Sequence, residues 1–114
     1  MDIYERVYHR DGYRCVYCGR YMLSDFDTWQ SIHTDHLVPL AKGGDDSLAN
    51  LVTSCPVCNT LKGSFVPEVD IHLAGKDAFI QKIREFIYKK RGQKLERFFR
   101  LIEQMNARYN PVKE

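Results

Sequence analysis

The sequence contains no long apolar run and no export signal. Its longest apolar stretches, such as residues 37–41, fall far short of the ~20 residues that a membrane-spanning helix requires. Residues 1–5 also lack the pattern of basic and then apolar residues that marks a secretory signal. We therefore expect a cytoplasmic protein that makes no contact with a membrane.

The chain also has no internal repeat, no low-complexity segment and no room for two full domains. It has 114 residues, of which 44% are apolar and 28% charged, so it can bury one modest core. This size excludes a two-domain enzyme. The composition changes beyond Pro67, and we expect one folded unit over residues 1–66 and a basic helical extension over residues 67–114.

Charge is distributed unevenly along the chain. The formal net charge is +2, but residues 82–100 contain eight cations and two anions, so this basic segment carries +6 and the remainder −4. Contact with nucleic-acid phosphates explains such clustering, and we select Lys89, Lys90 and Arg91 as nucleic-acid-binding residues. Contact with a protein partner and simple solubility are the alternatives. Nothing in the segment indicates base-specific recognition.

Local signals predict two short helices and a hairpin in the first unit. Asp2 and Glu5 resemble a capping box, so we expect a helix over Ile3–Arg10 that ends before Gly12. Residues 31–38 and 51–53 favour strands, joined by a long loop after Pro39. Pro56 suits the first position of a helix that ends at Gly63. The stretch through Asp27 reads as a polar loop.

Apolar residues recur at three- and four-residue steps in the extension. The spacing predicts two amphipathic helices, one over residues 79–87 and one over residues 95–105, broken near Gly92. One continuous helix over residues 77–109 is the alternative, because glycine inside a helix costs only ~1 kcal/mol relative to alanine. The apolar stripes are expected to pack in a core or against a partner.

The four cysteines form two Cys-x-x-Cys pairs, Cys15 with Cys18 and Cys55 with Cys58, separated by 36 residues. This spacing matches a structural Zn²⁺ site of four thiolates, which leaves no open position for catalysis. Redox chemistry and four unrelated buried thiols are the alternatives. Zinc binding is expected to be coupled to folding, because the first unit has a small core.

A further motif lies between and around the cysteine pairs. Residues 33–44 read HTDHLVPLAKGG, Asn50 and Leu51 follow, and residues 55–63 read CPVCNTLKG. Over residues 2–64 the chain resembles the HNH endonucleases. The resemblance implies an α+β fold, in which a zinc-stapled ββα-metal finger holds one divalent cation and hydrolyses a phosphodiester bond. The implied products carry 5′-phosphate and 3′-hydroxyl ends.

The resemblance also implies a role for each motif residue. Asp35 and His36 match the first motif position, Asn50 the second and Asn59 the third, which is the HNN variant of the pattern. His36 would be the general base, Asp35 and Asn59 the ligands of the catalytic cation, and Asn50 a brace for the loop that orients His36. Carboxylate and amide oxygens suit Mg²⁺ or Mn²⁺. With one formal negative charge in the site, we expect weak cation binding without DNA.

Two neighbours of this motif have open roles. His33 lies two residues before Asp35 and can be a metal ligand, a supporting hydrogen-bond partner or a substrate contact. Lys62 lies one helical turn after Asn59 and either meets a phosphate or is a solvated lysine. On a regular strand Asp35 and His36 point to opposite faces, so their joint action requires a twist, a bulge or a phosphate at the strand end.

The sequence therefore predicts a metal-dependent DNA endonuclease with an HNH module over residues 1–66. The alternative is a non-catalytic zinc-stabilised module that binds nucleic acid or protein. RNA as substrate is not excluded, since the chemistry of the site does not distinguish the sugar. We expect either a monomer or a homodimer. A single active site per chain cuts one strand at a time, so a double-strand break needs two copies or two encounters.

Overall fold

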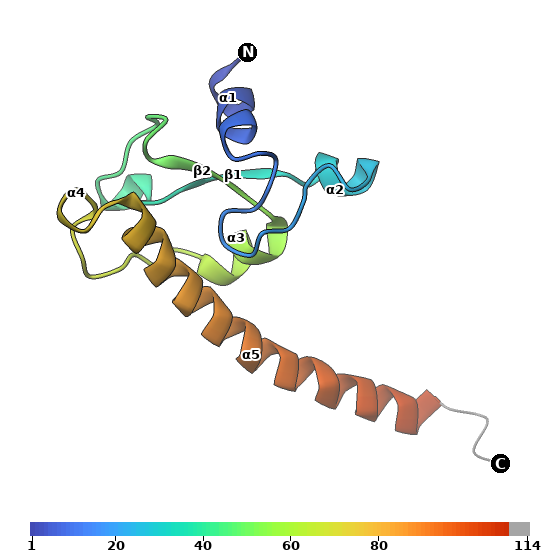
Figure 1. Ribbon diagram of the computed structural model, residues 1–114. Helices are drawn as coiled ribbons and strands as arrows, with labels where there is room; N and C mark the ends of the chain where they lie inside the picture. Colours follow the sequence, from blue (N-terminus) through green and yellow to red (C-terminus); the bar gives the residue numbers. More distant parts are fainter. Residues whose placement is uncertain (110–114) are drawn as a thin grey trace.

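A two-stranded antiparallel sheet lies between α1 on one side and α3 with the long helix α5 on the other (Figure 1). The computed structural model describes residues 1–109. Its elements, in chain order, are α1 (Ile3–Arg10), α2 (Phe26–Gln30), β1 (His33–His36), a 3₁₀ turn (Leu40–Lys42), β2 (Leu51–Ser54), α3 (Pro56–Lys62), α4 (Ile71–Ala74) and α5 (Lys76–Tyr109). The predicted α+β class is confirmed.

The N-terminal helix forms where the capping residues predict it. The Asp2 carboxylate accepts a hydrogen bond from the Glu5 backbone amide at 2.8 Å, which satisfies a free amide of the first turn. At the other end, the Arg10 guanidinium donates to the carbonyl oxygens of Leu48 and Leu51 at 2.7 and 2.6 Å. These bonds attach the end of α1 to the start of β2.

The hairpin pairs β1 with β2 without an interruption. The register runs from His33 opposite Ser54 to His36 opposite Leu51, and it contains no bulge. The observed strand is shorter at both ends than the strand predicted over residues 31–38, since β1 comprises only His33–His36. His36 is therefore the last residue of its strand.

The helix after the hairpin begins and ends as its sequence predicts. Pro56 is the first residue of α3, where a missing amide proton costs nothing, and Gly63 follows the last residue. Two other short helices were not predicted: α2 begins within the stretch read as a polar loop through Asp27, and α4 lies in the extension before its predicted helices. Asp25 caps α2, accepting from the Thr28 amide at 2.7 Å. Such caps are weak sequence signals when the helix has only five residues.

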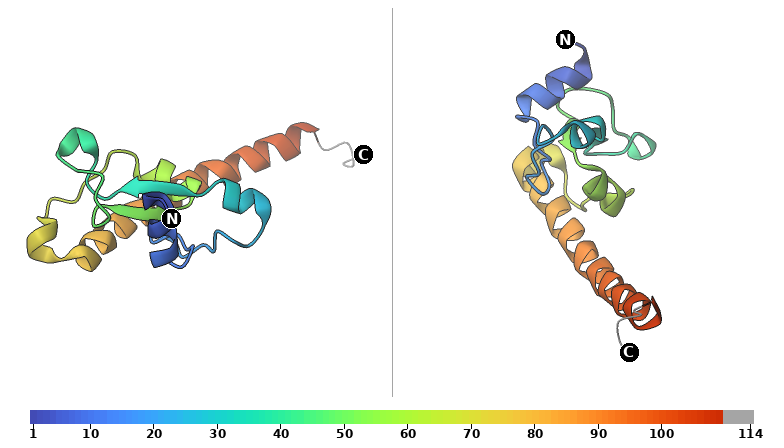
Figure 2. Two further views of the ribbon diagram at one scale, coloured as in Figure 1. Left: turned by 90° about the horizontal axis from the view of Figure 1, so that it is seen from above. Right: turned by 90° about the vertical axis from the view of Figure 1, so that its right-hand side faces the viewer.

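The C-terminal pair of amphipathic helices is a wrong prediction, because α5 is one helix of 34 residues that passes through Gly92 (Figure 2). The glycine is exposed, and its cost of ~1 kcal/mol does not outweigh continuous backbone hydrogen bonding. Within residues 1–109, no helix combines the length and apolar composition needed to span a bilayer.

The two halves of α5 have different surroundings. Phe79, Ile80, Ile83 and Ile87 are buried in the same core as Cys15, Tyr17, Leu37 and Val52, whereas every described side chain from residue 88 to residue 108 is exposed. The division predicted after residue 66 is therefore not a division of the core. The final residues of the predicted extension, 110–114, lie outside the described part of the chain.

Candidate functional site

The four cysteine sulfurs gather at one point, as the sequence predicts. All four lie within 4.8 Å of one another, and the sulfurs of Cys18 and Cys55 are 3.7 Å apart. Four sulfurs around one Zn²⁺ are about 3.8 Å apart when each Zn–S bond is about 2.3 Å. The cysteine cluster (Cys15, Cys18, Cys55, Cys58) therefore fits a closed structural zinc site.

Local backbone geometry builds this cluster. Gly19 has a positive φ of 79°, and its amide donates to the Cys15 carbonyl at 2.8 Å, which closes the first knuckle. Cys55 caps α3, and its sulfur accepts from the Cys58 amide at 3.4 Å. Hydrogen bonds from neighbouring thiols lower the pKa of Cys15, while burial raises the pKa of Cys18 to about 11. A bound Zn²⁺ ion would replace the protons that these thiols share.

The first knuckle also reaches the predicted catalytic residues. Tyr17 lies between the two cysteines of the knuckle, and its hydroxyl donates to Asp35 Oδ2 at 2.5 Å. Burial raises the pKa of Tyr17 strongly, and the nearby charge of Asp35 raises it further. The tyrosine therefore remains a neutral donor that connects the cysteine cluster to the strand carrying Asp35.

Asp35 is largely buried, with 8% of its surface exposed, and it already faces a positive charge. The ammonium of Lys62 lies 3.2 Å from Asp35 Oδ2 and donates to the His36 carbonyl oxygen at 2.9 Å. The Lys62 side chain is 1% exposed. It is therefore not the solvated lysine that the sequence allowed, and its ammonium contacts protein oxygens and is not presented to a phosphate at the surface.

His36 points away from Asp35, as expected for adjacent residues on a strand. Its Nε2 atom lies 2.7 Å from Asp46 Oδ1, on the loop after the 3₁₀ turn. Because β1 has no bulge, a bulge does not bring Asp35 and His36 together, and a twist or a phosphate at the strand end remains as the way for them to act jointly.

Asn50 holds that loop. Its side chain accepts from the Val38 amide at 2.9 Å and donates to the carbonyl oxygens of Val38 and Asp45 at 3.0 and 2.7 Å. Gly44 packs so tightly here that a Cβ atom would overlap the Val38 carbonyl oxygen. The amide thus ties both ends of the loop that carries Asp46, and the role of Asn50 as a brace for His36 stays a prediction.

The remaining predicted residues lie on α3 and at the start of β1. Asn59 is half-buried on α3, one turn before Lys62, so both project from the same helix face. Among the described residues none forms a hydrogen bond with the Asn59 side chain, which leaves its amide oxygen available. His33 is exposed at the opposite end of β1 from His36, and its supporting role stays a prediction.

Comparison with known proteins agrees with this geometry. Residues 15–65 match the family model described as HNH endonuclease. This stretch resembles an HNH endonuclease domain. It contains both cysteine pairs, the hairpin and α3, and the resemblance seen in the sequence is confirmed.

Two curated relatives match the chain in this region. Over 64 residues the chain is 36% identical to CRISPR-associated endonuclease Cas9 1 of Streptococcus thermophilus. The aligned residues are 54% of this chain and 6% of that protein. Over 68 residues the chain is 26% identical to anaredoxin of Nostoc sp.. The aligned residues are 60% of this chain and 80% of that protein. No solved structure matches the chain.

The sequence did not predict the contacts of three residues in the HNH domain. Asp46 contacts the imidazole, Tyr17 contacts Asp35, and Lys62 is a buried ion-pair partner. The alternation of Cys15 and Tyr17 in the knuckle is a signal that both point inward. No local pattern marks Asp46, because its contact depends on how the loop folds.

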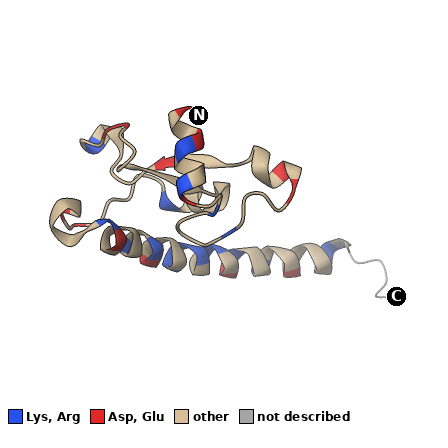
Figure 3. Cartoon of the chain, turned by 45° about the horizontal axis from the view of Figure 1, so that its top comes forward, with Lys and Arg blue, Asp and Glu red and all other residues tan. Residues whose placement is uncertain are grey.

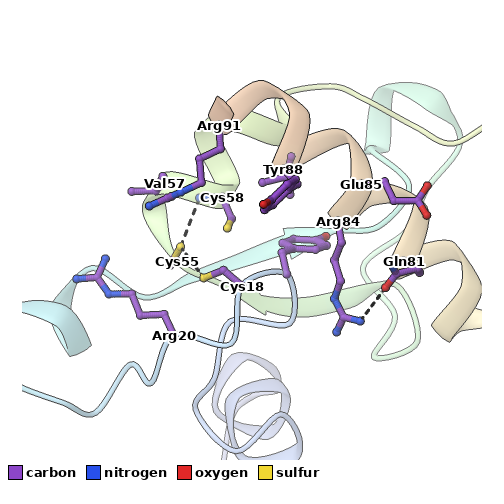
Figure 4. Close-up of a pocket in the computed structure, with 12 residues that line it drawn as sticks. Cys18, Arg20, Cys55, Val57, Cys58, Gln81, Arg84, Glu85, Tyr88 and Arg91 are labelled. Atoms are coloured by element: carbon purple, nitrogen blue, oxygen red, sulfur yellow. Dashed lines mark hydrogen bonds between the residues drawn. The ribbon is translucent and has the colours of Figure 1, made fainter. Parts of the chain in front are cut away.

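The predicted nucleic-acid-binding residues separate onto two sides of α5. Arg91 lines a hollow beside the cysteine cluster with Arg84 and Tyr88 (Figure 4). Lys89 and Lys90 instead line a groove that also includes Lys62. Because adjacent helical residues are about 100° apart, three consecutive cations cannot share one face.

Proposed function

We propose that this chain is a metal-dependent DNA endonuclease in which His36 takes the proton from the attacking water. The observation that carries the proposal is the contact between His36, at the end of β1, and Asp46, on the loop that Asn50 closes. The HNH match of residues 15–65 supports the same conclusion. A closed cluster of four cysteines does not supply this chemistry, so hydrolysis is assigned to the hairpin.

The imidazole has a defined orientation for this role. When Nε2–H donates to Asp46, Nδ1 is the unprotonated nitrogen and accepts the proton from water. Asp46 orients the ring, and Asn50 keeps Asp46 in reach by holding the Asp45 carbonyl oxygen. Histidine suits the task because imidazole changes protonation near neutral pH.

Asp35 and Asn59 are the residues that would hold the catalytic Mg²⁺ or Mn²⁺ ion. Their carboxylate and amide oxygens are hard donors, and the place beside Asp35 already accommodates the positive charge of Lys62. The cation would supply charge stabilisation for the phosphate and the departing oxygen. Since Lys62 neutralises Asp35, cation binding in the absence of substrate is expected to be weak.

Plasmid nicking with Mg²⁺ or Mn²⁺ tests this assignment. We expect His36→Ala to lower the rate by about 10²-fold or more, because a positioned general base contributes roughly that much. His72→Ala, an exposed histidine on α4, serves as the matched control and is expected to retain wild-type activity. Zinc content and thermal unfolding are measured for each. Equal nicking by wild type and His36→Ala would contradict the proposal.

The alternative function is a non-catalytic module that uses the same fold to bind nucleic acid or protein. The ion pair between Asp35 and Lys62 favours it, since a carboxylate that is already paired does not need a metal. Under this alternative, wild type binds DNA with the same affinity with and without Mg²⁺ and cleaves neither DNA nor RNA. Parallel assays on both nucleic acids also decide the sugar preference.

A further inference from the structure

A basic groove lies between α5 and the segment that follows α3. Its volume is about 950 Å³, and it is lined by five lysines and two glutamates. The lysines are Lys42, Lys62, Lys82, Lys89 and Lys90. Figure 3 shows how cations follow α5 along its length, with fewer acidic residues between them. Within the described chain this groove joins the basic segment to the HNH domain.

The walls of the groove are held in place. The Phe65 ring, after α3, stacks on the Phe86 ring of α5 with their centroids 3.9 Å apart and their planes within 4°. Lys42 donates to the Ser64 carbonyl oxygen at 2.9 Å, which fixes the 3₁₀ turn to the same wall. The groove is therefore a preformed feature, since an aromatic stack and a hydrogen bond hold its walls.

One residue of the groove wall contacts the proposed catalytic centre. Lys62 lines the groove, and its ammonium contacts both Asp35 and the His36 carbonyl oxygen. Two exposed lysines that α5 contributes to the groove, Lys82 and Lys89, lie seven residues apart, which is about 10 Å along the helix. That length corresponds to roughly three steps along the axis of a DNA duplex, in which each strand carries one charge per about 3.4 Å.

We propose that this groove binds the phosphodiester backbone of one substrate strand and leads it to His36. The inference rests on the proposed endonuclease function and names the path of its substrate. Lys82, Lys89 and Lys90 would bind phosphates next to the scissile one. Lysine ammonium groups present point charges to phosphates and contact no base edges from here, so the groove contributes affinity without sequence preference.

The test compares two triple variants of the full, zinc-loaded chain. Lys82→Ala, Lys89→Ala and Lys90→Ala together remove the exposed cations that α5 contributes to the groove. Lys94→Ala, Arg97→Ala and Arg100→Ala together remove the same charge from the same helix, outside the groove. Binding to a labelled DNA duplex is measured by fluorescence anisotropy over a range of salt concentrations, without added Mg²⁺ or Mn²⁺, so that cleavage does not interfere.

We expect the groove variant to bind about tenfold or more weakly, and its slope of log K against log salt to fall by about two to three units. The matched variant should change the slope by less than about one unit. With Mg²⁺, the loss in cleavage by the groove variant should appear in KM more than in kcat. Thermal unfolding confirms that both variants fold.

Three outcomes would overturn the groove assignment. Equal weakening by the two triple variants would show a general charge effect, and unchanged binding by the groove variant would show that no phosphate is bound there. Competition by polyglutamate as strong as competition by DNA would point to an acidic protein. If wild type binds through the groove but cleaves nothing, the groove stands and the endonuclease function fails. If wild type cleaves and the groove variant binds normally, the reverse holds.

Discussion

The cysteine cluster and the proposed catalytic centre (Asp35, His36, Asn50, Asn59) are built in opposite ways. The cluster brings four soft ligands to one point, three of them in the hydrophobic core, and the chain supplies every ligand. The proposed catalytic centre would offer two hard ligands from separate elements, and each motif residue except Asn59 contacts another protein group. The first is complete within the protein, whereas the second needs substrate oxygens to complete it.

This difference indicates that the cysteine cluster serves folding and that the proposed catalytic centre serves the reaction. The cluster joins the first knuckle to α3 and so fixes the hairpin between them, while Tyr17 transmits its position to Asp35. In the proposed catalytic centre, the Lys62 ammonium compensates the negative charge of Asp35. Stability should therefore depend mainly on the cluster and activity mainly on the centre.

The largest expected effect is the loss of folding when the cluster is broken. Cys55→Ser removes a ligand that is 2% exposed, and structural zinc sites contribute about 10–16 kcal/mol of apparent binding free energy in small domains. We expect this variant to bind less than one zinc per chain and to lose its cooperative thermal transition, as followed by circular dichroism.

Val57→Ser is the matched control for that variant, since Val57 is exposed on the same turn of α3 and contributes no ligand. It should keep one zinc and a cooperative transition. A Cys55→Ser chain that unfolds at the wild-type temperature would show that the cluster does not hold the fold.

An intermediate loss of stability is expected at Lys62, which pairs with Asp35 in the proposed catalytic centre. Lys62→Met keeps the length of the side chain but leaves the buried Asp35 carboxylate without its cation, which costs about 3 kcal/mol in typical buried pairs. We expect urea unfolding at a lower midpoint. Mg²⁺ should restore part of the loss, because a divalent cation can then occupy the place of the ammonium.

Lys42→Met is the control, because Lys42 is exposed and makes a single bond to Ser64. Its stability should fall by less than about 1 kcal/mol and show no dependence on Mg²⁺. If Mg²⁺ stabilised wild type and Lys62→Met equally, the place beside Asp35 would not be a cation site.

The features that could be predicted from the sequence are those with local causes. The cap at Asp2, the proline at the start of α3 and the two knuckles each depend on residues within a few positions of one another. The roles of Lys62 and Tyr17 depend on distant segments, 27 and 18 residues from Asp35, and no pattern within one element reveals them. The continuity of α5 depends on a balance of about 1 kcal/mol at Gly92.

The smallest effect is expected at Asp46, which distinguishes orientation from stability. Its carboxylate is 76% exposed, so its contact with His36 contributes little to folding. Asp46→Ala should leave thermal unfolding unchanged but lower kcat about tenfold, because the imidazole loses the partner that holds its proton on Nε2. Asp46→Asn keeps an acceptor oxygen and should recover most of that rate.

Asp45→Ala is the neighbouring control for this experiment. The Asp45 side chain bonds only Ser47 among the described residues, and Asn50 holds Asp45 through its backbone carbonyl oxygen, which alanine retains. Equal loss of kcat in Asp45→Ala and Asp46→Ala would mean that loop charge, not the contact with His36, sets the rate. A loss confined to Asp46→Ala and reversed in Asp46→Asn requires an acceptor at that one position.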